Sequence, residues 1–168
     1  MAKTNLIRQA TPSDFEAVDA LLARSYPALL KGAYPPSVLV TAIPLIARAQ
    51  PQLLASGTYY VVVEEDEIVG AGGWTRAQPG RASGGRARVG HIRHVVTDHR
   101  HVRRGIGRHL MEHIFAATRE AGLTRLECFA TTMAVPFYTS VGFATIGPMT
   151  VSLRPGIDLP AVHMRRGR

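Results

Sequence analysis

The chain has 168 residues, of which 46% are hydrophobic and 19% charged; this is typical of a globular protein and excludes a disordered one. A chain of this length suits one domain with a substantial core, so we expect a single domain over residues 1–168. The formal charge of +8 favours a polyanionic partner, but it does not choose among nucleic acid, membrane and phosphorylated cofactor. Because the sequence has one cysteine, no secretory signal and no apolar window long enough to cross a bilayer, we expect a cytoplasmic protein with no membrane partner.

The first half of the chain predicts a strand, two helices and a hairpin. Residues 5–11 are apolar enough for a short strand, and the tetrapeptide TPSD that ends at Asp14 has the composition of a capped helix start. Apolar side chains at helical spacing then indicate a helix to about Tyr26, and a second helix is expected over Ser37–Arg48. From Thr58 onward, two β-rich runs on either side of an acidic tip indicate a hairpin.

The second half predicts alternating strands and helices after a loop over residues 76–88, which are rich in Gly, Arg and Ser. Strands are expected over residues 89–97 and 123–130, with a helix between them that Gly122 ends. The apolar face of that helix consists of Ile106, Leu110, Ile114, Ala117 and Ala121. A short helix and two further strands follow. Since a strand–helix–strand unit makes a parallel pair, we expect an α/β (α+β) fold, with a mixed sheet and helices on its faces.

A Gly-x-Gly turn at the start of the predicted long helix is a candidate anion site. The first N–H groups of a helix are unpaired and carry partial positive charge, and glycines let the backbone approach a ligand. Three arginines surround the two glycines, which gives the set Arg103, Arg104, Gly105, Gly107 and Arg108. A dinucleotide fingerprint is excluded because Leu110 stands at its third glycine, and a Walker A loop is excluded because Gly-Lys-Ser/Thr is absent. The turn could also be a surface helix start with solvated arginines.

The residues on either side of this turn make the motif more specific. The chain resembles the GCN5-related N-acetyltransferase (GNAT) superfamily, whose signature is a strand ending in Val-x-Pro and then Gln/Arg-x-x-Gly-x-Gly/Ala. The stretch RRGIGRHLM matches the second half of that signature, and AVPFYTSVGF resembles the family's Ala-x-x-Phe/Leu-Tyr-x-x-x-Gly-Phe segment. There are three departures. His99 replaces the proline, Val102 stands at the Gln/Arg position, and Met133 lies where an asparagine often contacts pantetheine.

The resemblance implies a fold, a cosubstrate and a reaction. The implied sheet is mostly antiparallel, with one splayed parallel pair, here residues 91–97 and 126–130, and pantetheine would lie between these strands as an added strand. The implied reaction is direct transfer of an acetyl group from acetyl-CoA to a primary amine of a small molecule or peptide. The implied cofactor-binding residues are Val95, Val96, Thr97, Arg103, Arg104, Gly105, Ile106, Gly107 and Arg108.

Tyr138 and His91 are the candidate catalytic residues. Tyr138 matches the family's frequent general acid, which would protonate the leaving CoA thiolate, although an aromatic side chain in this segment could simply pack. His91 stands six residues before Thr97, at a position where several family members carry a catalytic Glu or His, although it could also be a structural histidine. Strict alternation would place His91, Arg93, Val95 and Thr97 on one side of the strand, with His94 on the other.

Two other classes of function remain open from the sequence. The chain could be a nucleic-acid-binding module that uses its basic loop and tail, but the aromatic residues are not interleaved with the basic ones as stacking platforms. It could also be an acyl-CoA sensor that has lost catalysis. No metal is expected, because His99 and His101 lack further ligands nearby. A homodimer is possible, and the acceptor amine cannot be named.

Overall fold

A seven-stranded mixed sheet forms the centre of the molecule in the computed structural model, which describes residues 5–77 and 88–167. The strand order is β1-β2-β3-β4-β5-β7-β6. In chain order the strands are β1 (Asn5–Gln9), β2 (Tyr59–Glu64), β3 (Glu67–Thr75), β4 (Val89–Thr97), β5 (Arg125–Ala130), β6 (Ala144–Arg154) and β7 (Ile157–Gly167). Strands β4 and β5 are parallel, and the other neighbouring pairs among these strands are antiparallel. The expected mixed, mostly antiparallel sheet is therefore confirmed.

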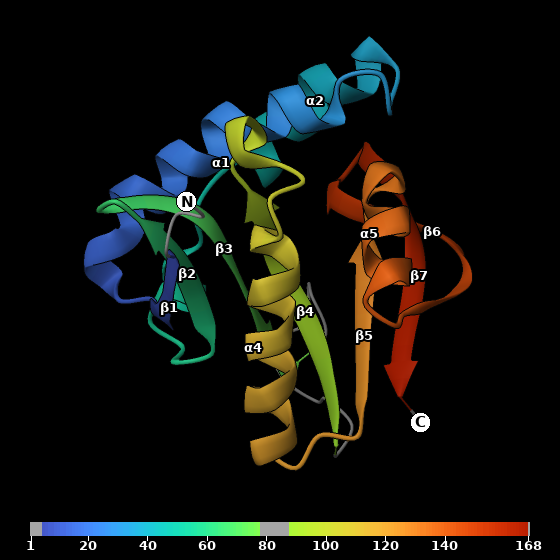
Figure 1. Cartoon of the computed structure of the whole chain (residues 1–168). Coiled ribbons are helices and arrows are strands. Elements are labelled where there is room, and N and C mark those ends of the chain that lie inside the picture. The colour runs from blue at the N-terminus through green and yellow to red at the C-terminus, as the bar shows by residue number, and fades with distance from the viewer. Residues whose placement is uncertain (1–4, 78–87, 168) are drawn as a thin grey trace.

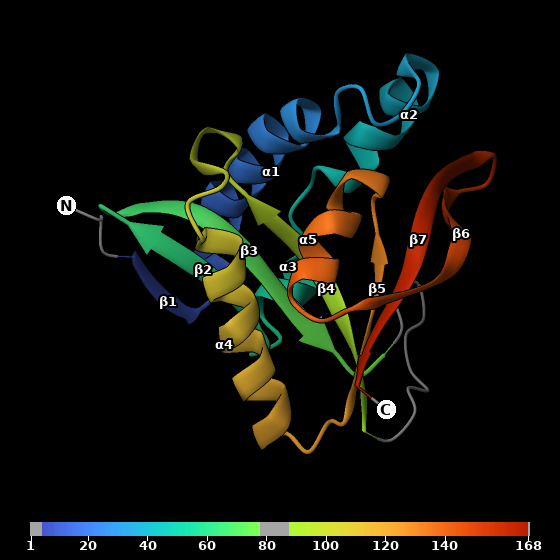
Figure 2. The ribbon, with the colours of Figure 1, turned by 45° about the vertical axis from the view of Figure 1, so that its right-hand side comes forward.

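Helices cover both faces of the sheet (Figure 1). Two of them, α4 (Ile106–Glu120) and α5 (Val135–Ser140), lie on one face, and α1 (Phe15–Leu30), α2 (Pro36–Ile46) and α3 (Pro51–Leu54) lie on the other. Figure 2 shows the hairpin of β6 and β7 extending beside α5. The predicted helices are confirmed, except that α1 continues to Leu30 with Pro27 inside it, and the short α3 was not expected. Within the described ranges no helix is long and apolar enough to cross a membrane.

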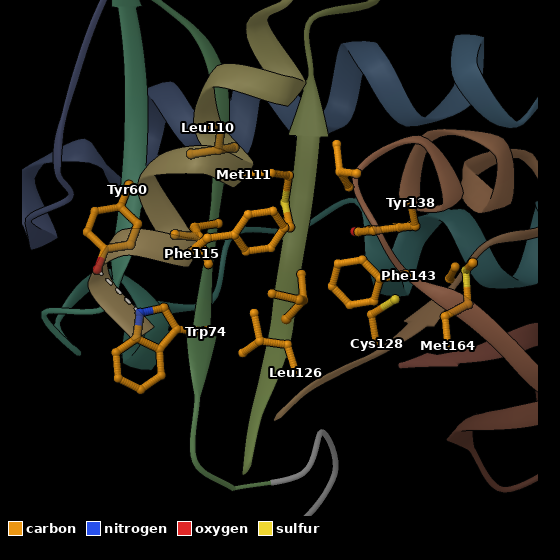
Figure 3. Packing of buried hydrophobic residues seen from close by; sticks show 14 of the residues in the cluster. Tyr60, Trp74, Leu110, Met111, Phe115, Leu126, Cys128, Tyr138, Phe143 and Met164 are labelled. Carbon is orange, nitrogen blue, oxygen red and sulfur yellow. Dashed lines mark hydrogen bonds between the residues drawn. The ribbon is translucent and has the colours of Figure 1, made fainter. Parts of the chain in front are cut away.

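The largest hydrophobic cluster lies between α4, α5 and the sheet (Figure 3). It buries the predicted apolar face of α4, since Ile106, Leu110 and Ile114 are almost wholly inaccessible. A fully buried side chain of this size contributes about 1.5–3 kcal/mol of transfer free energy. Two further clusters lie on the opposite face, one under α1 and α3 and one under α2 beside β7. Most of the expected loop, residues 78–87, lies outside the described residues.

Strands β4 and β5 pair only at their beginnings. The parallel ladder joins Val89–His91 to Arg125–Glu127 and ends there, whereas the pairing of β4 with β3 continues to Thr97 and that of β5 with β7 continues to Ala130. The two strands then diverge toward their carboxyl ends (Figure 1). The inner edge of β4 after His91 therefore has no neighbouring strand among the described residues, which confirms the splayed parallel pair.

A β-bulge at His94 changes which side chains share a face of β4. The register moves two residues along β3 but three along β4, and His94 takes a φ of 53°. Ile92 and Val95 consequently both pack on the α4 side, whereas Val96 packs under α1. The expected alternation, which put His91 and Arg93 on the same side as Val95 and Thr97, is therefore wrong past the bulge.

The bulge is accommodated by a glycine on the neighbouring strand. A Cβ at Gly72 would lie 2.7 Å from Cγ2 of Val95 and 3.2 Å from its Cα, so a larger residue would push β4 away. The glycine-rich sequence of β3 thus marks the place where the two backbones approach closely.

Candidate active site

A cavity of about 560 Å³ lies where β4 ends and α4 begins. Its walls come from α1, β4, the β4–α4 connection, the start of α4, the segment after β5, and α5. Most of the residues that the sequence motifs singled out line it, namely Val95, Val96, Thr97, Arg103, Gly105, Ile106, Gly107, Arg108 and Tyr138. The two motifs, which are separated by β5 in the chain, therefore meet around one space.

The start of α4 has the features of an anion site. Gly105 precedes the helix with a φ of 79°, and no side chain of the described residues caps the first N–H groups. Arg103 and Arg108 line the same space, and Nη2 of Arg108 donates to the carbonyl oxygen of Ser140 at 3.2 Å. Unpaired N–H groups, the helix dipole and two guanidinium groups together suit a phosphate group.

A neighbouring side chain explains why a glycine stands at position 107. A Cβ there would lie 2.9 Å from Cε1 of Phe137, so the glycine lets the phenyl ring of α5 pack directly on the first turn of α4. Its expected role, to bring the backbone close to a ligand, is thus accompanied by a packing role.

Arg104 does not line the cavity, in contrast to the other residues expected to bind cofactor. Its Nη2 donates to Oε1 of Glu64 at 2.9 Å, and the side chain of Glu64 is only 3% exposed. Arg104 therefore anchors the turn to the end of β2, and its expected place among the phosphate ligands is not supported.

Asp98 fixes the turn between β4 and α4, a role that the sequence did not reveal. Its fully buried carboxylate accepts hydrogen bonds from Arg24 and from both the backbone and the guanidinium of Arg100. Burial alone would raise the pKa of Asp98, but these hydrogen bonds hold it well below its usual range. The sequence signal for this role was an aspartate directly after a strand. The side chain of such an aspartate can accept a hydrogen bond from the backbone N–H two residues further along the chain. Arginine side chains therefore pair with this carboxylate. Within the described residues no cluster of side chains could hold a metal ion.

Tyr138 faces the cavity from α5. Its ring packs edge-on against Phe137 and Phe143, and Phe143 and Cys128 lie beside it in Figure 3. Burial raises the pKa of Tyr138 well above 10, and nearby Cys128 and Tyr26 raise it further. The phenol is therefore protonated at neutral pH and can donate a hydrogen bond. Cys128 is itself buried, which raises the pKa of its thiol to about 12, so it is a core residue.

His91 does not line the cavity. It is buried at the last parallel pair, opposite Glu127, whose carboxylate is 2.9 Å from Nε2 of His163 and 3.4 Å from Nη2 of Arg165. Burial lowers the pKa of His91; Glu127 opposes this shift, and Arg93 and His163 reinforce it. The imidazole is therefore largely neutral at neutral pH, on the opposite face of the sheet from Val95.

The bulge itself is held by three elements. Nε2 of His94 lies 2.8 Å from the carbonyl oxygen of Ile46, so this nitrogen carries the proton and donates it. The imidazole ring stacks on Tyr26, and the hydroxyl of Tyr59 donates to the carbonyl oxygen of His94 at 2.8 Å. Tyr26 lines the cavity, although it was not among the residues named for the site.

Comparison with known proteins agrees with this arrangement. The acetyltransferase (GNAT) domain model matches residues 39–165. A GCN5-related N-acetyltransferase from Rhodopseudomonas palustris superposes with a TM-score of 0.77 at 18% identity, covering 100% of this chain and 98% of that one. PaiA N-acetyltransferase from Thermoplasma acidophilum, solved with coenzyme A, gives a TM-score of 0.72 at 12% identity, over 98% and 99% of the two chains.

Part of a longer protein has a similar fold. N-acetylglutamate synthase from Neisseria gonorrhoeae, complexed with coenzyme A and N-acetylglutamate, superposes with a TM-score of 0.62 at 17% identity over 98% of this chain and 35% of that one. No curated protein sequence matches the chain. These identities show the fold alone, while the domain match covers most of the sequence. The chain therefore belongs to the GNAT acetyltransferase family.

Proposed function

We propose that the protein is an N-acetyltransferase that transfers the acetyl group of acetyl-CoA directly to a primary amine of a small molecule or peptide. The observation that carries this proposal is the convergence, around one cavity, of the unpaired edge of β4, the uncapped start of α4 and the hydroxyl of Tyr138. Membership of the GNAT family and two structural neighbours solved with coenzyme A support it.

Coenzyme A fits this arrangement in two parts. The pyrophosphate would accept hydrogen bonds from the first N–H groups of α4, with Arg103 and Arg108 adding charge. The pantetheine arm carries amide groups and would extend along Val95, Val96 and Thr97, whose inner edge has no strand beside it in the described part of the chain. This placement brings the thioester to the bulge, near Tyr138.

Tyr138 and His91 would then transfer the protons of the reaction. Tyr138 would donate one to the CoA sulfur as the carbon–sulfur bond breaks. His91, neutral at physiological pH, would accept one from the acceptor amine through water, because it lies outside the cavity and on the other face of β4. The acceptor would thus approach from the α1–α3 side, and we place the reaction in the cytoplasm without a membrane or nucleic-acid partner.

Two measurements test this function in sequence. Calorimetry should show that the protein binds acetyl-CoA, and an amine panel should identify acceptors through release of free CoA thiol. The panel should include amino acids, polyamines and peptide N-termini, with O-nucleophiles of matched size as controls. Binding without acetylation of any amine would point to the acyl-CoA sensor, and preference for an oligonucleotide over CoA would overturn the proposal.

A further inference from the structure

The hydroxyl groups of the five tyrosines fall into two groups. Three of them take part in hydrogen bonds within the protein: Tyr34 with Pro160 and Thr132, Tyr59 with His94, and Tyr60 with Trp74. Those of Tyr26 and Tyr138 make no hydrogen bond with any described residue. Tyr26 is half-buried and Tyr138 is buried, and neither oxygen is among the enclosed polar atoms that lack a partner, so both hydroxyls remain accessible to a small molecule.

Both exceptions line the same cavity, from opposite walls. Tyr26 comes from α1, on one face of the sheet, and Tyr138 comes from α5, on the other. The cavity lies where β4 and β5 have diverged, and Val95, Val96 and Thr97 line it as well. Both hydroxyls lack a hydrogen-bond partner within the described residues, so each is available to a ligand in this cavity. One ligand atom between them could accept from both.

Each ring is held in place before any ligand binds. Tyr26 stacks on His94 with 6.0 Å between ring centroids, and His94 is itself bonded to Ile46. Tyr138 is wedged between Phe137 and Phe143, at 5.2 and 5.3 Å between ring centroids. Rigid donors pay no reorganisation cost when charge develops, which is the condition for electrostatic stabilisation of a transition state.

Burial also keeps both phenols protonated, because it raises the pKa of Tyr26 and of Tyr138 above the ordinary tyrosine value. Two neutral donors with no other partner are suited to an atom that gains electrons during reaction. In acetyl transfer from CoA the leaving sulfur is one such atom. The amine nitrogen bonds to the carbonyl carbon and loses a proton, the carbon–sulfur bond breaks with its electron pair on sulfur, and sulfur gains a proton.

We propose that Tyr26 is a second catalytic hydrogen-bond donor to the CoA sulfur, acting together with Tyr138. Either hydroxyl can donate to the thiolate, and the phenolate that results regains its proton from solvent. This inference rests on the proposed function, since it requires CoA in the cavity, but it does not depend on which amine is the acceptor.

Equilibrium binding of CoA and of desulfo-CoA, in which hydrogen replaces the thiol, tests the inference without an acceptor. A thiol of this kind ionises near the ordinary value of about 8.5, so CoA affinity should rise with pH through that range. Tyr26→Phe keeps the ring and its stacking but removes the donor. We expect it to weaken CoA binding about tenfold at high pH and to leave desulfo-CoA binding unchanged.

The matched control is Tyr60→Phe, which removes a phenol hydroxyl from the core at a distance from the cavity. It should bind both ligands as the wild type does. The double variant Tyr26→Phe/Tyr138→Phe should lose the pH-dependent rise altogether and, once an acceptor is known, should lose more turnover than the product of the two single losses.

The outcomes separate this inference from the proposed function. If wild type binds CoA but Tyr26→Phe discriminates between CoA and desulfo-CoA as well as wild type does, the role of Tyr26 is overturned and the proposed function stands. If the wild type binds neither ligand, the proposed function falls and the role of Tyr26 falls with it. The circular dichroism spectrum of each variant should match that of the wild type.

Discussion

Arg24 on α1 donates two hydrogen bonds to a single oxygen of Asp98, from Nε at 3.1 Å and from Nη2 at 3.0 Å, across 74 positions of sequence. The carboxylate that it holds is wholly buried at the end of β4. This contact ties the first helix to the turn that leads into α4, and so it positions the phosphate end of the candidate site from the opposite face of the sheet.

Asp98→Asn should destabilise the protein by about 2–3 kcal/mol at pH 7, because the variant leaves Arg24 and Arg100 without the buried charge that pairs them. The pKa of Asp98 is lowered in the folded state, so its stabilisation is present above the unfolded value of about 3.9 and is lost as pH falls below it. Urea unfolding at pH 7 and pH 3 should show the difference shrinking at the lower pH. The control Asp66→Asn, at the exposed hairpin tip, should change stability by less than about 0.5 kcal/mol.

Substitutions of the three arginines around the start of α4 should have different effects, some on CoA binding and one on stability. Arg103→Gln combined with Arg108→Gln should weaken CoA binding at least about tenfold, because both side chains line the cavity, and should leave pantetheine binding unchanged. Arg104→Gln should instead reduce stability by about 1 kcal/mol, through loss of its bond to Glu64, with CoA affinity within about threefold of wild type. Calorimetry with both ligands is the measurement. An equal loss of CoA affinity in the Arg104 variant would mean that its guanidinium leaves Glu64 for the phosphates.

Tyr138→Phe should lower the turnover number about 10²-fold and leave acetyl-CoA affinity within about threefold, because the ring still fills its place between Phe137 and Phe143. The residual turnover would depend on Tyr26. The measurement is a steady-state titration under conditions where chemistry limits the rate. Wild-type turnover in this variant would show that the tyrosine is structural.

The pH profile should distinguish His91 from His94. Because the pKa of His91 is lowered, wild-type activity should rise with pH through an ionisation below about 6.5, and His91→Ala should abolish that limb. His94→Ala should keep the limb but weaken acetyl-CoA binding, since it removes the contacts to Ile46 and Tyr26 that hold the bulge. The converse pattern would assign the base to His94. Unchanged profiles in both variants would assign it to neither.

Patterns among residues that are close in the chain predicted most of the helices and strands and part of the candidate site. The spacing of apolar residues placed α4 and its buried face, and the two sequence motifs placed Gly105, Arg108 and Tyr138 around a common cavity. These features could be recognised because helix starts, caps and short helices depend on residues that are near one another in the chain.

What was missed depends on contacts between distant segments. The bulge at His94 needs the space above Gly72, and an alternating pattern read along β4 alone cannot show an extra residue. The bond from Arg104 to Glu64 spans 40 positions, and nothing in the arginine cluster indicates which member turns away from the ligand. The first helix was expected to end at about Tyr26, although it continues through Pro27 to Leu30 and brings Tyr26 to the cavity.

The short parallel ladder has a consequence for cooperativity. Strands β4 and β5 share three residue pairs, whereas β5 and β7 share six, so the sheet consists of two half-sheets, β1 to β4 and β5 to β7, joined by few hydrogen bonds. Such units can open independently, and we expect amide exchange in the two halves to report different opening free energies. A molecule that spans the gap would couple them, so the halves should exchange as one unit when it is bound. In this way the bound ligand would make the two half-sheets open cooperatively, in addition to its part in the reaction.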